Sequence, residues 1–280
     1  MSARQIFAAA AFALVAFVPQ FANAVDVKVV PAAKGEEVWF VEDHTVPIVA
    51  MSAAIPAGSA YDPQGEDGLS AMAAALLDEG AGKMNSDAYH TALDDKAIQL
   101  SVSPSRDYAV IRIVTLAENA KEAFQLLGLA LAHPRFDADA IQRIRAQMIE
   151  SIKQDEQEPA TVAGKEFARL FFAGHPYGHS VSGTPATLST IAQADLRQFA
   201  RSHWVRGGMK IAISGDVDEA EVKTLVGAAF DAIPATRPAS PPPVTRMGAP
   251  GIHVVPMPVP RPAINFGLPG ILRADKDFIA

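Results

Sequence analysis

GLSAMAAALLDEGAGKMNSDAYH occupies residues 68–90 and contains the most regular helical pattern in the first third of the chain. It begins as a helix made almost entirely of alanine and leucine, which are strong helix formers, and it breaks at Gly80 and Gly82. Asp67 or Ser70 is the expected N-cap, and Gly80 is the expected C-terminal stop. A second short helix is expected over residues 86–95. So plain a helix raises the question of what it is for.

The flanking sequence predicts a sheet between helices. Short β-branched and aromatic runs broken by Gly and Pro indicate strands before residue 63, and the alternating residues 98–116 indicate a hairpin about residues 104–107. Helical periodicity predicts helices over 117–134, 137–158, 159–172, 186–204 and 218–234. A buried strand is predicted over 207–217. The fold class is therefore α+β, with a mixed, mainly antiparallel sheet covered by helices.

Four regions are predicted along the chain. Residues 1–24 form a signal peptide, and residues 25–233 form an N-terminal α+β domain on a single core. Six of the 17 residues in 234–250 are proline, which predicts an extended linker. Residues 251–280 contain two short strand-like runs and are too few for a core of their own. They are expected to be the truncated beginning of a second, similar domain.

The predicted signal peptide sets the expected location. It has a short start with Arg4, an apolar run from Ile6 to Val18, and the small-x-small ending Ala22-Asn23-Ala24. A membrane anchor is the alternative, but the run is shorter than the roughly 20 residues that span a bilayer. The protein is expected to be periplasmic or secreted.

Composition excludes several kinds of function. The chain has 280 residues, is 49% apolar and 20% charged, and carries a net charge of −7, which argues against nucleic acid and anionic membranes as partners. It contains no cysteine, so disulfides, thiolate catalysis and cysteine-type zinc sites are excluded. The sequence lacks a Gly-x-Ser-x-Gly motif, a Walker A motif and a dinucleotide-binding glycine motif.

Histidines offer only weak candidates for a metal site. His175 and His179 are four residues apart, but Pro176 and Gly178 prevent a helix, so a structural turn is favoured over a loop metal site. His90 could pair with Asp94 or Asp95 on the second helix, although a solvated charged face is the more common arrangement. From the residues alone, the sequence offers a fold without a complete active site.

Four stretches in order resemble the insulinase/pitrilysin family of zinc peptidases (inverzincins), which includes the mitochondrial processing peptidases. They lie at residues 56–69, at 76–94, in the helix pair around Pro159, and at 171–191. The resemblance covers residues 26–280 and implies the LuxS/MPP-like metallohydrolase fold. It also implies a full subunit made of two such domains in tandem.

The same resemblance implies a degenerate zinc site. In active members an H-x-x-E-H motif follows the Gly-Leu that opens the first helix, and its two histidines bind zinc while its glutamate polarises water. Those positions fall on Ala71, Ala74 and Ala75, and the position of the distal glutamate ligand falls on Ser151. Methyl groups cannot hold zinc, so we expect no catalytic residue and no metal bound by this chain.

The resemblance therefore implies a proteolytically inactive subunit. Such a subunit would pair with an H-x-x-E-H zinc peptidase subunit, which holds the zinc, and would help to enclose peptides. The expected peptide contact is the edge strand near Leu100, Ser101, Val102 and Ser103. The alternatives are a non-proteolytic scaffold of the same fold and an active zinc peptidase with unrecognised ligands. Neither nucleic acid nor, after signal cleavage, a membrane is expected as a partner.

Overall fold

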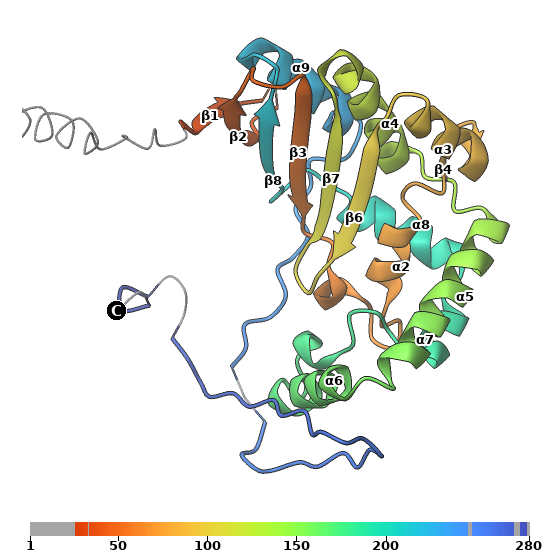
Figure 1. Cartoon of the computed structure of the whole chain (residues 1–280), viewed down its shortest axis with the longest axis vertical. Coiled ribbons are helices and arrows are strands. Elements are labelled where there is room, and N and C mark those ends of the chain that lie inside the picture. Colours follow the sequence, from red (N-terminus) through yellow and green to blue (C-terminus); the bar gives the residue numbers. More distant parts are fainter. Residues whose placement is uncertain (1–25, 33, 246–247, 272–274, 279–280) are drawn as a thin grey trace, which may run out of the picture.

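The structure is a computed structural model that describes residues 26–32, 34–245, 248–271 and 275–278. A six-stranded sheet forms its centre, with the strand order β1-β2-β8-β3-β7-β6 (Figure 1). The strands are β1 (Lys28–Pro31), β2 (Glu37–Glu42), β3 (Ile48–Ile55), β6 (Gln99–Pro104), β7 (Ala109–Leu116) and β8 (Lys210–Gly215). A separate two-stranded ribbon consists of β4 (Gly80–Ala81) and β5 (Met84–Asn85).

The sheet is mixed and mainly antiparallel, as predicted. Only β2 and β8 pair in parallel, and the other neighbours in the sheet are antiparallel. The predicted hairpin is confirmed, because β6 pairs with β7 from Gln99 opposite Val114 to Pro104 opposite Ala109. β6 and β1 are the two edge strands.

Helices flank the sheet and extend beyond it (Figure 1). They are α2 (Leu69–Ala75), α3 (Ser86–Asp94), α4 (Ala120–Ala132), α5 (Ala138–Asp155), α6 (Pro159–Phe171), α7 (Pro185–Thr190), α8 (Gln193–His203) and α9 (Glu219–Phe230), with short 3₁₀ turns η1 (Ser59–Tyr61), η2 (Ala117–Asn119) and η3 (Pro176–Gly178). The segment predicted as one helix over 186–204 is two helices, α7 and α8, separated at Ile191–Ala192.

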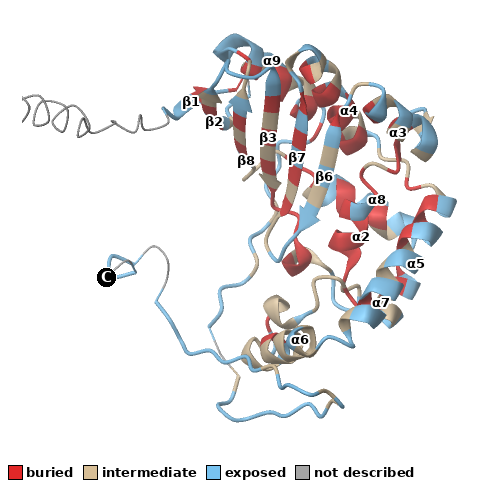
Figure 2. Ribbon diagram, viewed as in Figure 1, coloured by how far each residue is buried: buried red, intermediate tan, exposed pale blue. Residues whose placement is uncertain are grey.

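The core lies between one face of the sheet and the helices (Figure 2). Alternate residues of β3 are buried, including Val49, Met51 and Ile55, as expected for a strand with one covered face. α4 and α9 pack closely on each other, and Gly128 permits this because a Cβ there would lie 2.3 Å from the carbonyl oxygen of Ala228.

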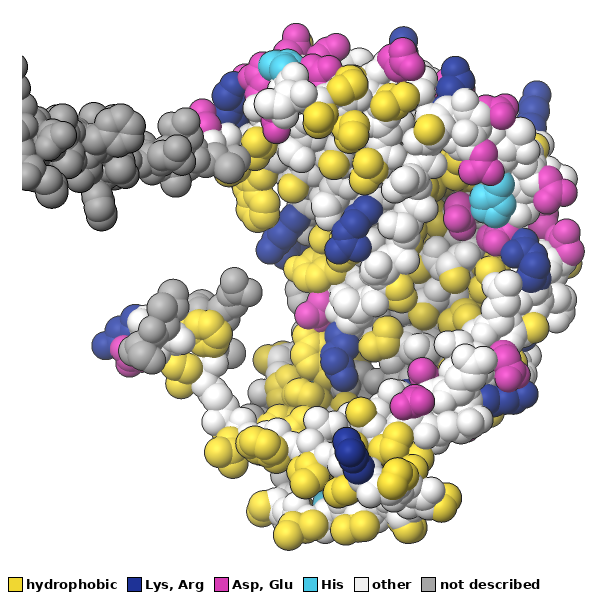
Figure 3. Space-filling view, in the orientation of Figure 1, with side chains coloured by type: hydrophobic (Ala, Val, Ile, Leu, Met, Phe, Trp, Pro, Cys, Tyr) yellow, Lys and Arg dark blue, Asp and Glu magenta, His cyan; other side chains and the backbone are white. Residues whose placement is uncertain are grey.

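The opposite face of the sheet is open and partly apolar. Trp39 on β2 is 49% exposed, and Ile48 and Val114 on β3 and β7 are 38% exposed. The strand register places Trp39, Ala212, Ser52, Arg112 and Ser101 in one row across this face. Figure 3 shows hydrophobic side chains gathered on this side of the sheet. Helices therefore cover one face of the sheet and leave the other available.

All helices and strands that the structure describes lie within residues 28–230. The described residues of the predicted linker have neither helix nor strand, yet they contact the domain: the carbonyl oxygen of Pro242 lies 2.7 Å from His175 Nε2. The described residues within 251–280 also form no strand, although two strand-like runs are expected there. A strand needs a partner to satisfy its backbone, and none of the described strands pairs with this segment. The linker and the second domain stay predictions.

The predicted signal peptide, residues 1–24, lies outside the described residues. Within the described part of the chain, none of the helices has the length and apolar character needed to cross a membrane.

Candidate functional site

Helix α2 carries the positions on which a zinc site would depend, and Asp62 fixes where it starts. The Asp62 carboxylate accepts hydrogen bonds from the backbone N–H groups of Gly68 (2.9 Å) and Ser70 (2.8 Å). It thereby satisfies N–H groups that lack an intrahelical partner. Burial raises the pKa of Asp62 to about 7 and outweighs these two donors, which favour the ionised carboxylate.

The expected ends of this helix are therefore wrong. The N-cap is Gly68, whose φ of 94° lies in the left-handed region, and neither Asp67 nor Ser70 caps the helix with its side chain. Asp62 lies too far before the helix for a local capping pattern to identify it. The helix ends at Ala75, five residues before Gly80, which instead begins β4.

A loop distant in sequence holds the start of α2. Asp67 Oδ1 lies 2.9 Å from His179 Nδ1, and the Thr187 hydroxyl donates a 2.7 Å hydrogen bond to the Asp67 carbonyl oxygen. Gly183 has a positive φ of 73°, and a Cβ there would lie 2.2 Å from the same carbonyl oxygen. The turn-rich segment after α6 is thus a support for α2.

The positions that correspond to zinc ligands and catalytic glutamate carry no suitable donor. Ala71 and Ala74 are buried at 6% and 4% exposure, whereas Ala75 is exposed. Ser151 is exposed on α5, and α5 contacts α2, so the structure brings together the two helices that would form the site. Zinc takes imidazole, carboxylate or thiolate ligands, and three methyl groups and one hydroxyl do not replace them. These residues do not fit a zinc ion.

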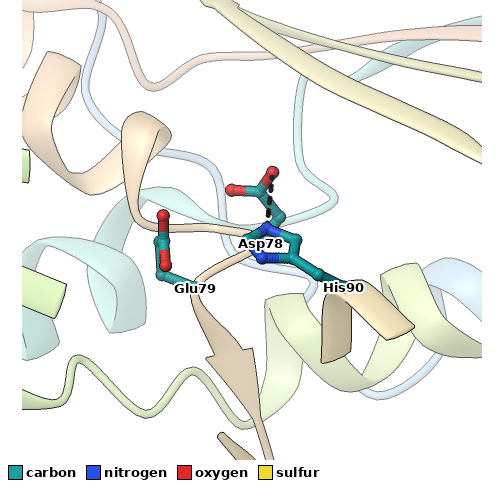
Figure 4. Close-up of side chains that lie close together, drawn as sticks. All are labelled: Asp78, Glu79 and His90. Carbon is teal, nitrogen blue, oxygen red and sulfur yellow. Dashed lines mark ion pairs between the residues drawn. The ribbon is translucent and has the colours of Figure 1, made fainter. Parts of the chain in front are cut away.

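A polar cluster directly follows α2 (Figure 4). Asp78 and Glu79 precede β4, and His90 reaches them from α3, so that one potential ligand atom of each lies within 4.8 Å of the others. His90 Nε2 lies 3.6 Å from Asp78 Oδ2. The alternative that His90 pairs with Asp94 or Asp95 is wrong, because its ion-pair partner comes from the preceding turn. Burial raises the pKa of Asp78, and His90 partly offsets this effect.

Glu79 accepts three hydrogen bonds from two other side chains. Arg143 Nη1 donates to Glu79 Oε1 (2.8 Å) and Nη2 donates to Oε2 (2.5 Å), while the Ser86 hydroxyl also donates to Oε2 (2.5 Å). The Arg143 hydrogen bonds hold the pKa of Glu79 below its usual range although the side chain is only 6% exposed. Three donors already occupy most of the lone-pair sites of this carboxylate, so the cluster serves as a tie between α5 and the β4–α3 region. Nothing in the spacing of Glu79 and Arg143 could predict this contact.

His175 and His179 have separate structural partners. His175 is buried, its Nδ1 accepts a hydrogen bond from the N–H of Tyr177 (3.1 Å), and its Nε2 donates to the Pro242 carbonyl oxygen. His179 pairs with Asp67. Both rings are committed to different neighbours, as the structural-turn interpretation expects.

The candidate peptide-binding strand lies where the sequence suggests. β6 is the last strand of the sheet, and its free edge has no partner strand among the described residues. Leu100 and Val102 are partly buried against the core, while Ser101 and Ser103 are exposed. β6 also contacts α2, so an added strand would lie next to the helix with the missing zinc ligands.

Comparison with known families gives two matches that together cover most of the chain. The sequence model described as "Insulinase (Peptidase family M16)" matches residues 37–185, and that described as "Peptidase M16 inactive domain" matches residues 190–280. Strands from both matched regions belong to one sheet, because β8 lies in the second region and pairs with β2 and β3 of the first.

Relatives of this chain have both peptidase and non-peptidase names. A "Non-peptidase homolog YmxG" of Helicobacter pylori is 25% identical over 180 residues, covering 64% of this chain and 42% of the relative. The beta subunit of the mitochondrial-processing peptidase of Blastocladiella emersonii is 20% identical, covering 64% of this chain and 39% of the relative. Human cytochrome b-c1 complex subunit 1 is 19% identical, covering 70% and 41%. The chain spans less than half the length of these relatives.

Solved structures share the fold. A peptidase M16 inactive domain from Pseudomonas fluorescens superposes with a TM-score of 0.72 at 23% identity, covering 81% of this chain and 54% of the other. Pitrilysin superposes with a TM-score of 0.70 at 18% identity, covering 81% and 25%. The expected insulinase-like fold is confirmed.

Proposed function

Because the chain belongs to the insulinase family of peptidases, family M16, we propose that it is a non-catalytic member that binds peptides next to a zinc-bearing partner subunit. The partner would be an insulinase-family subunit with an intact H-x-x-E-H motif, and it would supply both the zinc and the catalytic glutamate. This chain would supply a wall and a binding edge of the chamber that encloses the peptide.

The observation that carries the proposal is a set of four side chains, three on α2 and one on α5. Ala71 and Ala74 are buried at the positions of the first histidine and the glutamate, and Ala75 and Ser151 replace the other two ligands. A single replacement would leave part of a metal site, but four leave no imidazole or carboxylate to bind zinc or to activate water. Among the relatives, the name "non-peptidase homolog" supports the same interpretation.

Two observations support a partner. Relatives are named as subunits, one of mitochondrial-processing peptidase and one of the cytochrome b-c1 complex. The sheet also leaves one face open, and Trp39, Ile48 and Val114 are large apolar residues exposed on it. Apolar groups on an open face are suited to burial against another protein surface.

Peptide binding is proposed at the free edge of β6. An extended peptide can add to an unpaired strand through main-chain hydrogen bonds, which depend little on the peptide's sequence. Residues 100–103 offer such an edge, and their strand lies against α2. A bound peptide would therefore run beside the helix where an active family member holds its metal.

We also propose a periplasmic or secreted location, which rests on the sequence of residues 1–24. Mass spectrometry of the protein from its native host tests this directly. A mature N-terminus at Val25 supports the proposal, and a retained N-terminal segment contradicts it.

The proposed division of labour is tested by purifying this chain with and without an H-x-x-E-H subunit encoded beside it. We expect peptide cleavage by the mixture to exceed cleavage by the partner alone, and this chain alone to cleave nothing. A mixture no more active than the partner would favour the scaffold alternative. Stoichiometric zinc with cleavage by this chain alone would show an active peptidase.

The proposed peptide edge is tested by two neighbouring proline substitutions, Ser101→Pro and Val102→Pro. Successive N–H groups of a strand point to opposite edges, so one substitution removes a bond to β7 and the other removes only an outward donor. We expect the variant that loses only the outward N–H to keep its melting temperature and to lose binding of an extended peptide. If both variants bind the peptide as the parent does, β6 is not the binding edge.

A further inference from the structure

A groove beside α8 has no role in the proposed function. Its volume is about 920 Å³, and it lies between α8, the loop that joins α4 to α5, and the residues that follow α9. None of the residues that line it belongs to β6 or α2. What gathers in it is positive charge, from Arg135, Arg197 and Arg201, although the chain as a whole has a net charge of −7.

Most of this charge is not compensated within the groove. Asp137 is the one carboxylate among the lining residues, and it pairs with Arg135 at 2.6 Å. Within the described residues, neither Arg197 nor Arg201 has a carboxylate within ion-pair distance. Arg197 Nη2 donates to the carbonyl oxygen of Arg135 (3.2 Å), and Arg201 Nη2 contacts Gln198 Oε1 at 3.4 Å. Each guanidinium has five N–H donors, so most of them remain available to a ligand.

The floor of the groove is apolar. Leu131, Ala200, Trp204 and Ile233 line it and are themselves buried. Arg197 and Arg201 are four residues apart on α8, so both project from the same helical face. The groove thus combines an apolar floor with guanidinium groups spread along its rim, which suits an extended ligand with several contacts better than a single small ion.

We propose that this groove binds an acidic peptide segment, with carboxylates on Arg197 and Arg201 and an apolar side chain against the floor near Trp204. Guanidinium groups bind carboxylates through short, charge-assisted hydrogen bonds. The net negative charge of the rest of the protein repels acidic chains, so the groove concentrates the attraction at one place. This site is separate from the β6 edge and does not depend on the proposed pairing with a peptidase subunit.

The test uses the full chain carrying Trp39→Phe, which leaves Trp204 as the single tryptophan. The probe is a fluorescein-labelled peptide that repeats Asp-Glu-Leu three times. We expect it to bind, to change the Trp204 emission, and to bind roughly tenfold more weakly when Arg197→Glu and Arg201→Glu are combined, a loss of about 1.4 kcal/mol. The milder Arg201→Gln variant should weaken binding in the same direction and guards against a folding defect.

The matched control combines Arg261→Glu with Lys276→Glu, which changes the total charge equally at exposed residues outside the groove. We expect this control to bind more tightly than the groove variant. Equal binding by the two double variants would overturn the proposal, as would full displacement of the peptide by inorganic phosphate at the same concentration. Equal affinity for a peptide with serine in place of leucine would show that the apolar floor plays no part.

Discussion

Two consecutive stretches of the chain, Leu69–Ala75 and residues 78–90, differ in what their side chains offer. The first carries the positions that the family resemblance assigns to a zinc site, and it has no imidazole, carboxylate or thiolate that could bind zinc. The second has three groups that could bind a metal, Asp78, Glu79 and His90, but both oxygens of Glu79 already accept hydrogen bonds from Arg143 or Ser86. A cluster of polar side chains is therefore not by itself a metal site. Its capacity to bind a metal depends on how many of its lone pairs already accept hydrogen bonds.

The largest expected effect of a substitution comes from adding a charge to the first stretch. Ala74→Glu places a carboxylate at a position that is 4% exposed, and we expect the free energy of unfolding to fall by about 2–4 kcal/mol. Ala75→Glu is the matched control, because Ala75 is exposed on the same helix and should lose less than about 0.5 kcal/mol. Urea unfolding measures both. Equal stability of Ala74→Glu and the parent would mean that the helix does leave room for the catalytic side chain.

The second stretch should respond next most strongly, to the loss of Arg143. Arg143→Met leaves the buried Glu79 without its main partner, and we expect a loss of about 2 kcal/mol. The control is Arg169→Met: Arg169 also binds a carboxylate with two nitrogens, that of Glu166, but the pair is more exposed. It should lose less than about 1 kcal/mol. Similar losses in both variants would contradict a structural role for the Glu79 tie.

Asp62, which accepts hydrogen bonds from the backbone at the start of α2, should make stability depend on pH. The pKa of Asp62 is raised to about 7 by burial, so the folded state holds a proton that the unfolded state releases near pH 4. The contribution of Asp62 to stability is therefore highest below about pH 4 and falls as the pH rises to about 7, by about 4 kcal/mol for a pKa difference of about three units. Asp62→Asn should remove that decline. Asp94→Asn, at an exposed residue, should keep it, and a decline that survives Asp62→Asn would refute the assignment.

The smallest effect is expected at His90. Its contact with Asp78 is a 3.6 Å ion pair between partly exposed groups, so His90→Gln should change stability by less than about 0.5 kcal/mol. The same variant should leave zinc binding unchanged, as measured by isothermal titration. A clear loss of zinc binding would make the cluster a metal site after all.

Much of the fold followed from local patterns. Alternation of polar and apolar residues predicted the β6–β7 hairpin, and 3.6-residue periodicity predicted α4, α5 and α9. The break between α7 and α8 at Ile191–Ala192 was missed, although Ser189 and Thr190 just before it and Ile191 within it are weak helix formers. Residues 251–271 were interpreted as strand-like, yet none of the strands that the structure describes pairs with them, because composition does not determine which strands pair.

The family resemblance assigns the zinc-site positions to residues that cannot bind zinc, and this assignment stays a prediction. The glycines and acids on either side of the helix align it with the family motif and so assign the motif positions to Ala71, Ala74 and Ala75. The structure shows that α2 and α5 lie in contact. The contacts of Asp62 with α2 and of Arg143 with Glu79 were not predictable. They join residues that are 6 to 64 positions apart, and their partners are chosen by tertiary packing.

The central claim, that this chain holds no catalytic zinc, is tested most directly by measuring zinc content and peptide cleavage together. The protein would be purified alone, incubated with zinc, dialysed, and analysed by inductively coupled plasma mass spectrometry, and its activity would be read with a fluorogenic peptide. The account predicts far less than one zinc ion per chain and no cleavage. One zinc ion per chain, together with cleavage that a chelator abolishes, would contradict it.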